Sequence, residues 1–585
     1  MHARHRRFAL ALTLPALMTP VAQAQPVLTQ IVQDFARDPG WDNYQNRVVG
    51  TGMPQRCQDF GWSPTAHAAP ASSPGEIGGR LANSRIPAYY AMPLGRSLTF
   101  DDALSASGLV ALTELGPRGV SYFGFFSGRR HTWRVYSSMA FRLWEEDGSA
   151  QVMFDWMSSD WRGRGAETDV LIDPDGRVHT FRFVYDPDAR PDPVWHDPLL
   201  ARHVTDETGN MRPIALQGEE YILQRARQDE PGLTAAGLRQ RLLAARDQGL
   251  IEYFHRHGQD RWRKIPHPDR NHGGVTLQFD QHIPRVIWLD DEIRRAPVEL
   301  DRFGLFNVCR YGTGQTVYFS SVTVNGQELD LSQDAHWVGL HNHATWPEPD
   351  FHSMNSFGWT QTQWAGGAPG EIGGLLWRVE PEDPGFAMYA DGVGTLSLDD
   401  PVEFTGQVCF VDGMTDGSMF FGYFSRGEFM QPLDQPDAHE ACPPSSMMGI
   451  TLNDVTADGY YFAPVVRAAD CTTVEDSRRH RYLPDRRPCA FSFRYDPVAN
   501  DGNGRVTYAI AGEEGTFDLA PALRRAGAQF DRFGLATVRQ GGNSVELYFD
   551  DLAYTVRRDP SVPLPSHAQA ITERAYPADS AGRAH

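Results

Sequence analysis

Two glutamates stand in identical hexapeptides far apart in the chain. Glu76 lies in Pro74–Gly79 and Glu371 lies in Pro369–Gly374, and both segments read PGEIGG. A carboxylate between glycines can bind a sugar hydroxyl or act as a general acid or base, because glycine allows a close approach to the backbone. The same pattern also suits a turn whose amides donate to the carboxylate. We predict Glu76 and Glu371 as catalytic candidates, with a structural turn as the alternative.

Histidines cluster near the middle of the chain, and two of them, His341 and His343, are separated by a single residue. On a strand such a pair points to the same side of the sheet. A histidine with tyrosine or arginine nearby can remove the proton beside a uronate carboxyl, which is lyase chemistry. Ligand sites also favour domain interfaces. We therefore predict His341 or His343 as a general base at the junction of two domains.

Aromatic and arginine side chains supply the predicted substrate contacts. Sugar faces stack on aromatic rings, and arginine pairs in a bidentate manner with a uronate or sulfate. The segment Asp155–Gly165, DWMSSDWRGRG, contains both residue types. An exposed loop is the alternative for this segment, and core packing is the alternative for the other tryptophans. The predicted substrate-binding residues are Trp62, Trp156, Trp161, Arg162, Arg164 and Trp359.

Paired aspartates indicate a possible metal site. Asp399 and Asp551 each belong to an Asp-Asp pair, and Ser320-Ser321 takes the place of the second pair in the first half of the chain. Calcium binds clustered carboxylates and carbonyls. We predict Asp399 and Asp551 as ligands of a structural calcium ion, with solubility of turns and edge strands as the alternative. The chain has no phosphate-binding loop and no dinucleotide fingerprint, so we expect no organic cofactor.

The N-terminus has the features of a secretory signal peptide. Residues 1–24 combine a basic start, an apolar run and the small-residue pattern Ala22-Gln23-Ala24. The alternative, a membrane anchor, is disfavoured because the apolar run is too short to span a bilayer. A net charge of −20 disfavours nucleic-acid binding. We expect a secreted or periplasmic protein with a glycan partner and no membrane span.

Six cysteines in an exported chain indicate disulfides. Cys471 and Cys489 are close in sequence, and we predict a bridge between them, with Cys442 as a competing partner. Cys409 aligns with Ala111 of the first half in a predicted strand. We predict that Cys409 is a buried thiol.

A duplicated scaffold positions these residues. DRFGL occurs at Asp301–Leu305 and again at Asp531–Leu535, and further matches keep the same order in both halves. Within each half, Gly, Pro, Asn and Asp separate short apolar or alternating runs, which is typical of strands. The predicted strands are 98–102, 119–126, 139–143, 180–185 and 316–324, then 396–400, 419–424, 448–452, 490–495 and 545–554.

These patterns predict an all-β fold of two tandem β-sandwich, or jelly-roll, domains. We expect the first domain at 25–326, the second at 327–558 and a disordered tail at 559–585. The first domain carries a helical insertion at about 190–271, in which 219–228 and 235–257 are the predicted helices.

The segment Tyr495–Ile510, followed by FDRFGL and YFDDLAY, resembles the concanavalin A-like jelly rolls of lectins, laminin-G-like modules, glucanases and several polysaccharide lyases. The acidic Glu-x-Asp-x-x-Glu strand of the retaining glucanases is missing. The resemblance implies a carbohydrate-active protein, although a fold alone does not establish a function.

Two functions follow as hypotheses. The first is an enzyme, a glycoside hydrolase or a polysaccharide lyase, that degrades an extracellular polysaccharide. The second is a non-catalytic glycan-binding or cell-envelope protein. Divergence between the two copies discriminates between these two hypotheses. An enzyme is expected to have a polar, aromatic cleft in one copy and a plain scaffold in the other.

Overall fold

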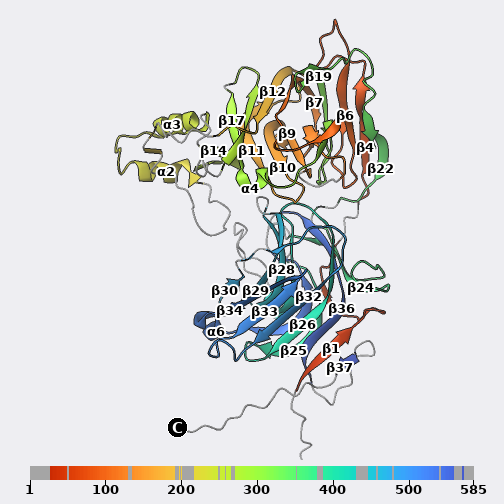
Figure 1. Ribbon diagram of the computed structural model, residues 1–585, viewed down its shortest axis with the longest axis vertical. Helices are drawn as coiled ribbons and strands as arrows, with labels where there is room; N and C mark the ends of the chain where they lie inside the picture. The colour runs from red at the N-terminus through yellow and green to blue at the C-terminus, as the bar shows by residue number, and fades with distance from the viewer. Residues whose placement is uncertain are drawn as a thin grey trace, which may run out of the picture.

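The computed structural model describes residues 27–571 except for 49–51, 130–134, 191–196, 198, 201–216, 248–250, 257–258, 265–270, 283, 351, 353, 379–385, 430–445, 456–458, 477, 479, 539–541 and 559–568. The predicted signal peptide and most of the predicted tail lie outside the described residues. The described chain forms two antiparallel β-sandwiches, one above the other in Figure 1. The predicted all-β fold is confirmed.

The first sandwich packs two sheets around a core that includes Phe123, Phe181 and Val317. One, the β4 sheet, has the order β17 (Arg285–Asp290), β16 (Asn271–Phe279), β12 (Val178–Asp186), β7 (Leu104–Leu115), β19 (Gln315–Val324), β5 (Glu76–Leu81), β4 (Gln55–Ser63) and β22 (His343–Pro347), with β20 (Gln327–Glu328) beside β19. The other, the β9 sheet, has the order β11 (Gly163–Ile172), β10 (Ser149–Met157), β9 (Ser138–Glu146), β8 (Val120–Phe126), β18 (Leu300–Phe306), β6 (Tyr89–Leu98) and β21 (Val338–Leu340).

The second sandwich has the same construction around a core that includes Phe404, Phe421 and Phe533. Its β36 sheet has the order β3 (Arg47–Val48), β23 (Asn355–Thr360), β24 (Glu371–Trp377), β36 (Ser544–Arg558), β26 (Val402–Gly413), β32 (Cys489–Asp496), β33 (Arg505–Ile510) and β34 (Glu513–Asp518), with β1 (Val27–Gln33) beside β36 and β37 (Gln569–Ile571) beside β1. Its β28 sheet has the order β2 (Asp42–Tyr44), β25 (Met388–Ser397), β35 (Gln529–Ala536), β27 (Ser418–Phe424), β28 (Met447–Val455), β29 (Gly459–Arg467) and β30 (Thr473–Glu475), with β31 (His480–Arg481) beside β29.

The strand register is the same in the two sandwiches at matched residues. Tyr318 of β19 pairs with Ala111, and Tyr548 of β36 pairs with Cys409. The predicted match of Cys409 with Ala111 is therefore correct. Cys409 is fully buried as a free thiol, as predicted.

The N-terminal segment, residues 27–48, belongs to the second sandwich. β1 pairs with β36, β2 with β25 and β3 with β23. Conversely, β21 and β22 follow the expected boundary in sequence but pair with β6 and β4 of the first sandwich. Figure 1 shows β1, in red, beside β36 in the lower body and β22, in green, beside β4 in the upper one. The sandwiches therefore comprise 55–347 and 27–48 plus 355–558, which differs from the expected division at 326.

A tight turn explains this difference. Asn325 and Gly326 have φ values of 48° and 79°, so a two-residue hairpin keeps the chain in the first sandwich after β19. In the second sandwich the edge of β36 from Leu552 to Arg558 pairs with β1.

The insertion contains two helices and a small sheet. α2 (Glu219–Ala226) and α3 (Ala235–Asp247) stand out from the first sandwich in Figure 1. α3 ends earlier than predicted, because Ile251–Arg256 forms the strand β14, which pairs with β15 (Gln259–Lys264). β13 (Gln217–Gly218) completes this sheet, and the other helices of the described residues are α4 (Asp291–Arg294), α5 (Arg426–Phe429) and α6 (Pro521–Ala526). No helix within the described ranges is long and apolar enough to cross a membrane.

Two predicted strands, 98–102 and 396–400, are mainly turns. The carboxylate of Asp102 accepts the amide of Thr99 at 2.8 Å, and that of Asp400 accepts the amide of Ser397 at 2.9 Å. These local hydrogen bonds favour a turn over an extended backbone. The predictions of these two strands were wrong because they relied on the apolar residues and did not consider that the aspartates favour a turn.

The predicted bridge between Cys471 and Cys489 is also wrong. Cys489 carries a free thiol that donates to the Tyr482 hydroxyl at 3.4 Å, whereas Cys471 is disulfide-bonded. The competing partner, Cys442, lies outside the described residues.

The sandwiches meet through apolar and charged contacts. Leu375 and Trp377 of the second sandwich join an apolar cluster with Phe306 of the first. Arg85 of the first sandwich pairs with Glu546 of the second at 3.6 Å. This junction gives one border to the site described below.

We expect residues 52–347 to fold alone and residues 355–558 not to. The second piece lacks Ile31, Phe35 and Trp41, which are buried in its core, and each such side chain stabilises the fold by about 1.5–3 kcal/mol. Its β36 edge is also left open. Joining 27–48 to the end of 355–558 through a flexible linker restores the fold. Circular dichroism and urea unfolding check this, and a cooperative transition for 355–558 alone at the same urea midpoint as the joined chain contradicts it.

Candidate functional site

Glu76 and Glu371 each hold the loop that precedes their strand. Glu76 is fully buried and accepts the Thr65 hydroxyl at 2.5 Å and the Ala68 amide at 2.7 Å. Glu371 is equally buried, and its two oxygens accept the amide of Trp364 at 2.9 and 3.0 Å. Glu371 faces backbone amides, and Glu76 faces backbone amides together with the Thr65 hydroxyl and the His67 ring, whose Nδ1 is 2.8 Å from Oε1. These contacts within the turn are what the structural alternative expects. A catalytic role for either stays a prediction.

The hydrogen bonds keep Glu76 charged. Burial by itself raises the pKa of a carboxyl, but the Thr65 hydroxyl and the amides of His67 and Ala68 donate to this one, and the net pKa of Glu76 is lowered. An ionised carboxylate only accepts, so it can satisfy all these donors at once. This explains why the residue is a glutamate rather than a glutamine.

Each of these loops places a ring on a tyrosine of the neighbouring strand. The His67 ring stacks on Tyr318 with centroids 4.0 Å apart and planes at 16°. In the second sandwich Trp364 takes the place of His67 and stacks on Tyr548 at 6.3 Å and 29°. Both tyrosines lie on the outer face of their sheet, because the neighbouring phenylalanines in the strands face the core. The two copies therefore present equivalent faces with different rings.

The glycines of PGEIGG make room for these tyrosines. A Cβ on Gly78 would lie 2.2 Å from the Val317 carbonyl oxygen and 2.7 Å from the Tyr318 ring. A Cβ on Gly373 would likewise lie 2.8 Å from the Tyr548 ring. Any other residue would displace the tyrosine, so the repeated glycines are explained by packing.

His343 lies on the same outer face of the first sandwich. Its Nδ1 is 3.0 Å from Asp59 Oδ1, and its Nε2 would be 3.1 Å from a Cβ on Gly61. Both side chains are exposed. The other predicted base, His341, has its Nδ1 2.8 Å from the Pro87 carbonyl oxygen. Of these two predicted bases, His343 is the one with a carboxylate at its ring nitrogen among the described residues.

The second sandwich replaces this histidine with an arginine. Arg47 Nη2 would be 3.3 Å from a Cβ on Gly358, the position that His343 takes in the first copy. Arg47 also donates to the Ser356 hydroxyl at 3.3 Å and the Trp359 carbonyl at 2.9 Å. At these matched positions the first sandwich has two histidines, and the second has an indole and a guanidinium instead.

Trp364 is exposed on the outer face of the second sandwich, as His67 is on that of the first. Its side chain remains 36% exposed, whereas Tyr548 beneath it is buried. The guanidinium carbon of Arg486 lies 5.7 Å from the Trp364 ring centroid. The Tyr548 hydroxyl donates to Glu546 at 2.8 Å, and Glu546 pairs with Arg85 across the junction. We call Trp364, Tyr548, Arg486 and Glu546 the Trp364 platform.

Three of the predicted substrate-binding tryptophans have structural contacts. Trp62 donates its indole N–H to the Leu331 carbonyl at 2.9 Å, and Trp359 donates to the Phe35 carbonyl at 2.9 Å. These bonds attach each sheet to the segment that completes it. Trp156 is fully buried in the core of the first sandwich. Core packing was the alternative considered for them.

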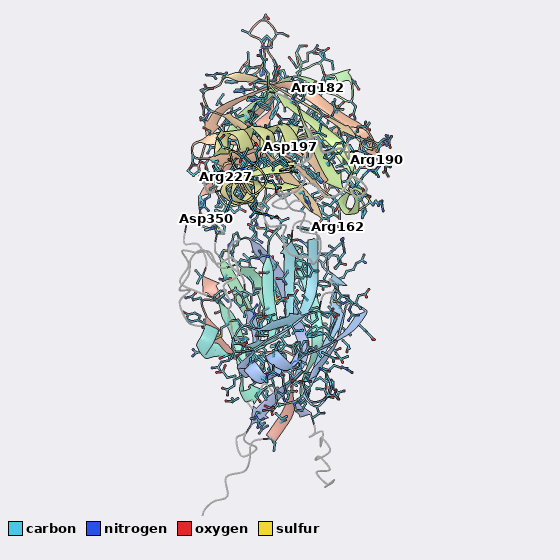
Figure 2. The ribbon with its side chains drawn as sticks, turned by 90° about the vertical axis from the view of Figure 1, so that its left-hand side faces the viewer. Arg162, Arg182, Arg190, Asp197, Arg227 and Asp350 are labelled. Atoms are coloured by element: carbon cyan, nitrogen blue, oxygen red, sulfur yellow. The ribbon has the colours of Figure 1, made fainter. Side chains whose placement is uncertain are left out.

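The remaining predicted contacts lie toward the junction. Trp161 is only 2% exposed, and its ring lies 5.5 Å from that of Tyr460 in the second sandwich. Arg162 pairs with Asp160 at 2.8 Å, at the end of the first sandwich that faces the second (Figure 2). Arg164 is part-buried on β11. This segment joins the sandwiches, and a ligand role for it stays a prediction.

The predicted calcium ligands do not come together. Asp399 pairs with Arg524 at 2.7 Å, before β26 begins at Val402. Asp551 follows the residue that pairs with Gln407, so roughly 17 Å of strand separate the two. In the part of the chain that the structure describes, no three His, Cys, Asp or Glu side chains form a metal site. Calcium stays a prediction.

Sequence reasoning missed His67, Trp364, Tyr318, Tyr548 and Arg486. The tyrosines stand in matched Tyr-Phe pairs of β19 and β36, which was a usable signal. The rings precede their glutamates by 9 and 7 residues respectively. This difference in spacing hid the equivalence of the two rings.

Asp550 lies beneath the loop that precedes β24. It is 3% exposed, and a Cβ on Gly366 would come within 1.5 Å of its Oδ2. Burial raises the pKa of Asp550 to about 7, the negative charges of Asp551, Glu371 and Asp34 add to the rise, and the Asp551 amide opposes it. The first copy has a serine at this position, so this titration belongs to the second sandwich.

Comparison with known proteins gives only remote likenesses. No family model and no curated protein matches the chain. Among solved structures, the carbohydrate recognition domain of Emp47p is 12% identical, with 34% of this chain and 88% of that chain covered and a TM-score of 0.21. Peanut lectin with a 9mer peptide is 11% identical, with 37% and 91% covered and a TM-score of 0.21. A Lotus tetragonolobus seed lectin is 12% identical, with 35% and 93% covered and a TM-score of 0.20. Similarity at this level carries no argument about ligand or activity.

We expect Asp550→Asn to remove one source of pH dependence. A carboxyl whose pKa is higher in the folded than in the unfolded chain loses stability as the pH rises from about 3.9, and for Asp550 the loss ends near its pKa of about 7. The melting temperature of Asp550→Asn relative to wild type should therefore rise by roughly 2–4 °C between pH 4 and pH 7.5. Calorimetry across this range measures it, with Asp551→Asn as the exposed control. A difference that is constant with pH contradicts the assignment.

Proposed function

We propose that this chain is a carbohydrate-binding protein of the extracellular space or periplasm, and that its ligand lies on the Trp364 platform. The observation that carries the proposal is the exposed Trp364 ring, stacked on Tyr548 and fixed by the buried carboxylate of Glu371. An indole that is fixed before the ligand arrives loses little conformational entropy on binding. Sugar faces are apolar on one side and carry hydroxyls at the rim, which suits an aromatic ring beside charged groups.

The surroundings of the platform support this proposal. Arg486 supplies hydrogen-bond donors and Glu546 supplies acceptors next to the ring. Arg85 brings a residue of the first sandwich to its border, and ligand sites favour such interfaces. The signal-like N-terminus and the net charge of −20 support export and disfavour a nucleic-acid partner.

A second candidate function, cleavage of the glycan, is favoured by His343. Asp59 presents a carboxylate to Nδ1 and can only accept, so Nδ1 carries the proton and Nε2 is left as a base. Nε2 lies over Gly61, which pairs with Gly78, and the Tyr318 ring lies over Gly78. A base and a phenol over adjacent strands suit the general acid–base steps of a hydrolase or a lyase.

We expect Trp364→Ala to weaken retention on the bound polysaccharide by roughly tenfold or more, because the stacking surface is lost. Affinity electrophoresis against neutral, uronic and sulfated polysaccharides measures the dissociation constants. Val498→Ala, at an exposed apolar residue of the same sandwich, is the matched control. Unchanged retention of Trp364→Ala, or no retention of the wild type by any polysaccharide, contradicts the proposed function.

We expect His343→Ala to reduce glycan cleavage by about 100-fold, as is typical when a general base is removed. New reducing ends and the absorbance of unsaturated uronates are followed together, since both rise for a lyase and only the former for a hydrolase. His336 is the matched control, because it is also exposed and lies 3.5 Å from a carboxylate of Asp334. Equal rates for His343→Ala and His336→Ala, or no cleavage by the wild type, reject catalysis at this site.

A further inference from the structure

Two hydrogen bonds, one from its backbone amide and one from its Nε, hold Arg486 beside the Trp364 ring. Its amide donates to the Phe410 carbonyl at 3.1 Å, and its Nε donates to the Val411 carbonyl at 3.3 Å. The first bond attaches the backbone of Arg486 to β26, and the second attaches its side chain. The guanidinium carbon then lies 5.7 Å from the Trp364 ring centroid. The residue is nevertheless exposed, so its terminal amino groups are accessible to a ligand.

The backbone at Arg486 is in a conformation that arginine rarely adopts. Its φ is 61°, in the left-handed region that favours glycine. Strain of this kind persists where the surroundings impose it, and it concentrates at binding and catalytic sites. Here the residue with this backbone conformation is the one whose guanidinium lies beside the Trp364 ring.

No carboxylate among the described residues lies within 4.0 Å of Arg486, which sets it apart from its neighbours. Arg487 pairs with Asp485 at 4.0 Å. Glu546, the carboxylate of the platform, is engaged by the Tyr548 hydroxyl and by Arg85. Asp412 interacts with Arg486 electrostatically from beyond ion-pair distance. In a chain of net charge −20, a guanidinium that makes no ion pair within 4.0 Å among the described residues, next to an exposed indole, favours an anionic ligand.

We propose that the Trp364 platform binds acidic sugars: a sugar ring stacks on Trp364, and its carboxylate or sulfate ester accepts hydrogen bonds from Arg486. This inference rests on the proposed function and adds the substrate class. A planar guanidinium can donate two parallel bonds to an oxyanion. The same oxyanion chemistry is offered by uronic acids and by sulfated sugars, and the experiment separates these sources.

Calorimetric titration of the chain from residue 25 with two matched pairs of probes tests the proposal. One pair is a galacturonic acid oligosaccharide and its methyl ester, and the other is a sulfated dextran fragment and the unmodified fragment. The wild type should bind the anionic member of at least one pair about tenfold more tightly at low salt. Arg486→Gln should remove this preference and leave the neutral member unaffected. The matched control Arg487→Gln should keep it.

The outcomes separate this inference from the proposed function. Equal binding of both members of each pair by the wild type, or an equal effect of Arg486→Gln and Arg487→Gln, overturns the acidic-sugar proposal alone, provided that Trp364→Ala still weakens binding. Unchanged binding by Trp364→Ala, or no binding of any probe, overturns both. A preference in only one pair identifies the oxyanion as carboxylate or sulfate.

Discussion

The pairing of β1 with β36 is the interaction on which the arrangement of both sandwiches depends. The edge of β36 from Leu552 to Arg558 is covered by β1, and β37 in turn pairs with β1. An uncovered edge of this length would expose unpaired amides and carbonyls. Residues 27–48 lie in the second sandwich, residues 55–347 in the first and residues 355–558 in the second again, so the chain crosses the junction twice. The two bodies are therefore held together by the connectivity as well as by their contacts.

In each copy, one buried carboxylate fixes the loop that precedes its strand. Glu76 and Glu371 are the acceptors around which the preceding loops fold, and the glycines beside them admit a tyrosine of the neighbouring strand. The repeated PGEIGG segment therefore positions a loop whose aromatic ring, His67 or Trp364, lies on the outer face of a sheet. Its repetition reflects a shared scaffold, and the chemistry depends on which ring the loop carries.

The two copies differ at the positions that this scaffold presents. A histidine stacked on tyrosine and a second histidine oriented by Asp59 distinguish the first copy. An exposed indole, with Arg486 beside it, distinguishes the second. Titratable rings suit proton transfer and an indole suits stacking, so the duplication allows acid–base chemistry and binding to reside on separate sandwiches.

The sequence by itself determined the all-β class, the duplication and the equivalence of positions such as Ala111 and Cys409, because alternating apolar residues and repeated segments are local properties of the chain. Only the tertiary structure decided which sandwich each of two matching segments completes. Residues 27–48 pair with the second sandwich, and the strands β21 and β22 pair with the first, although the two segments have similar sequences. It also decided the site. The stacking of Trp364 on Tyr548 joins an irregular loop to β36, and Arg486 is held beside it by a hydrogen bond to β26. Contacts between segments remote in sequence leave no periodic pattern, so they become visible only when the sheets are assembled.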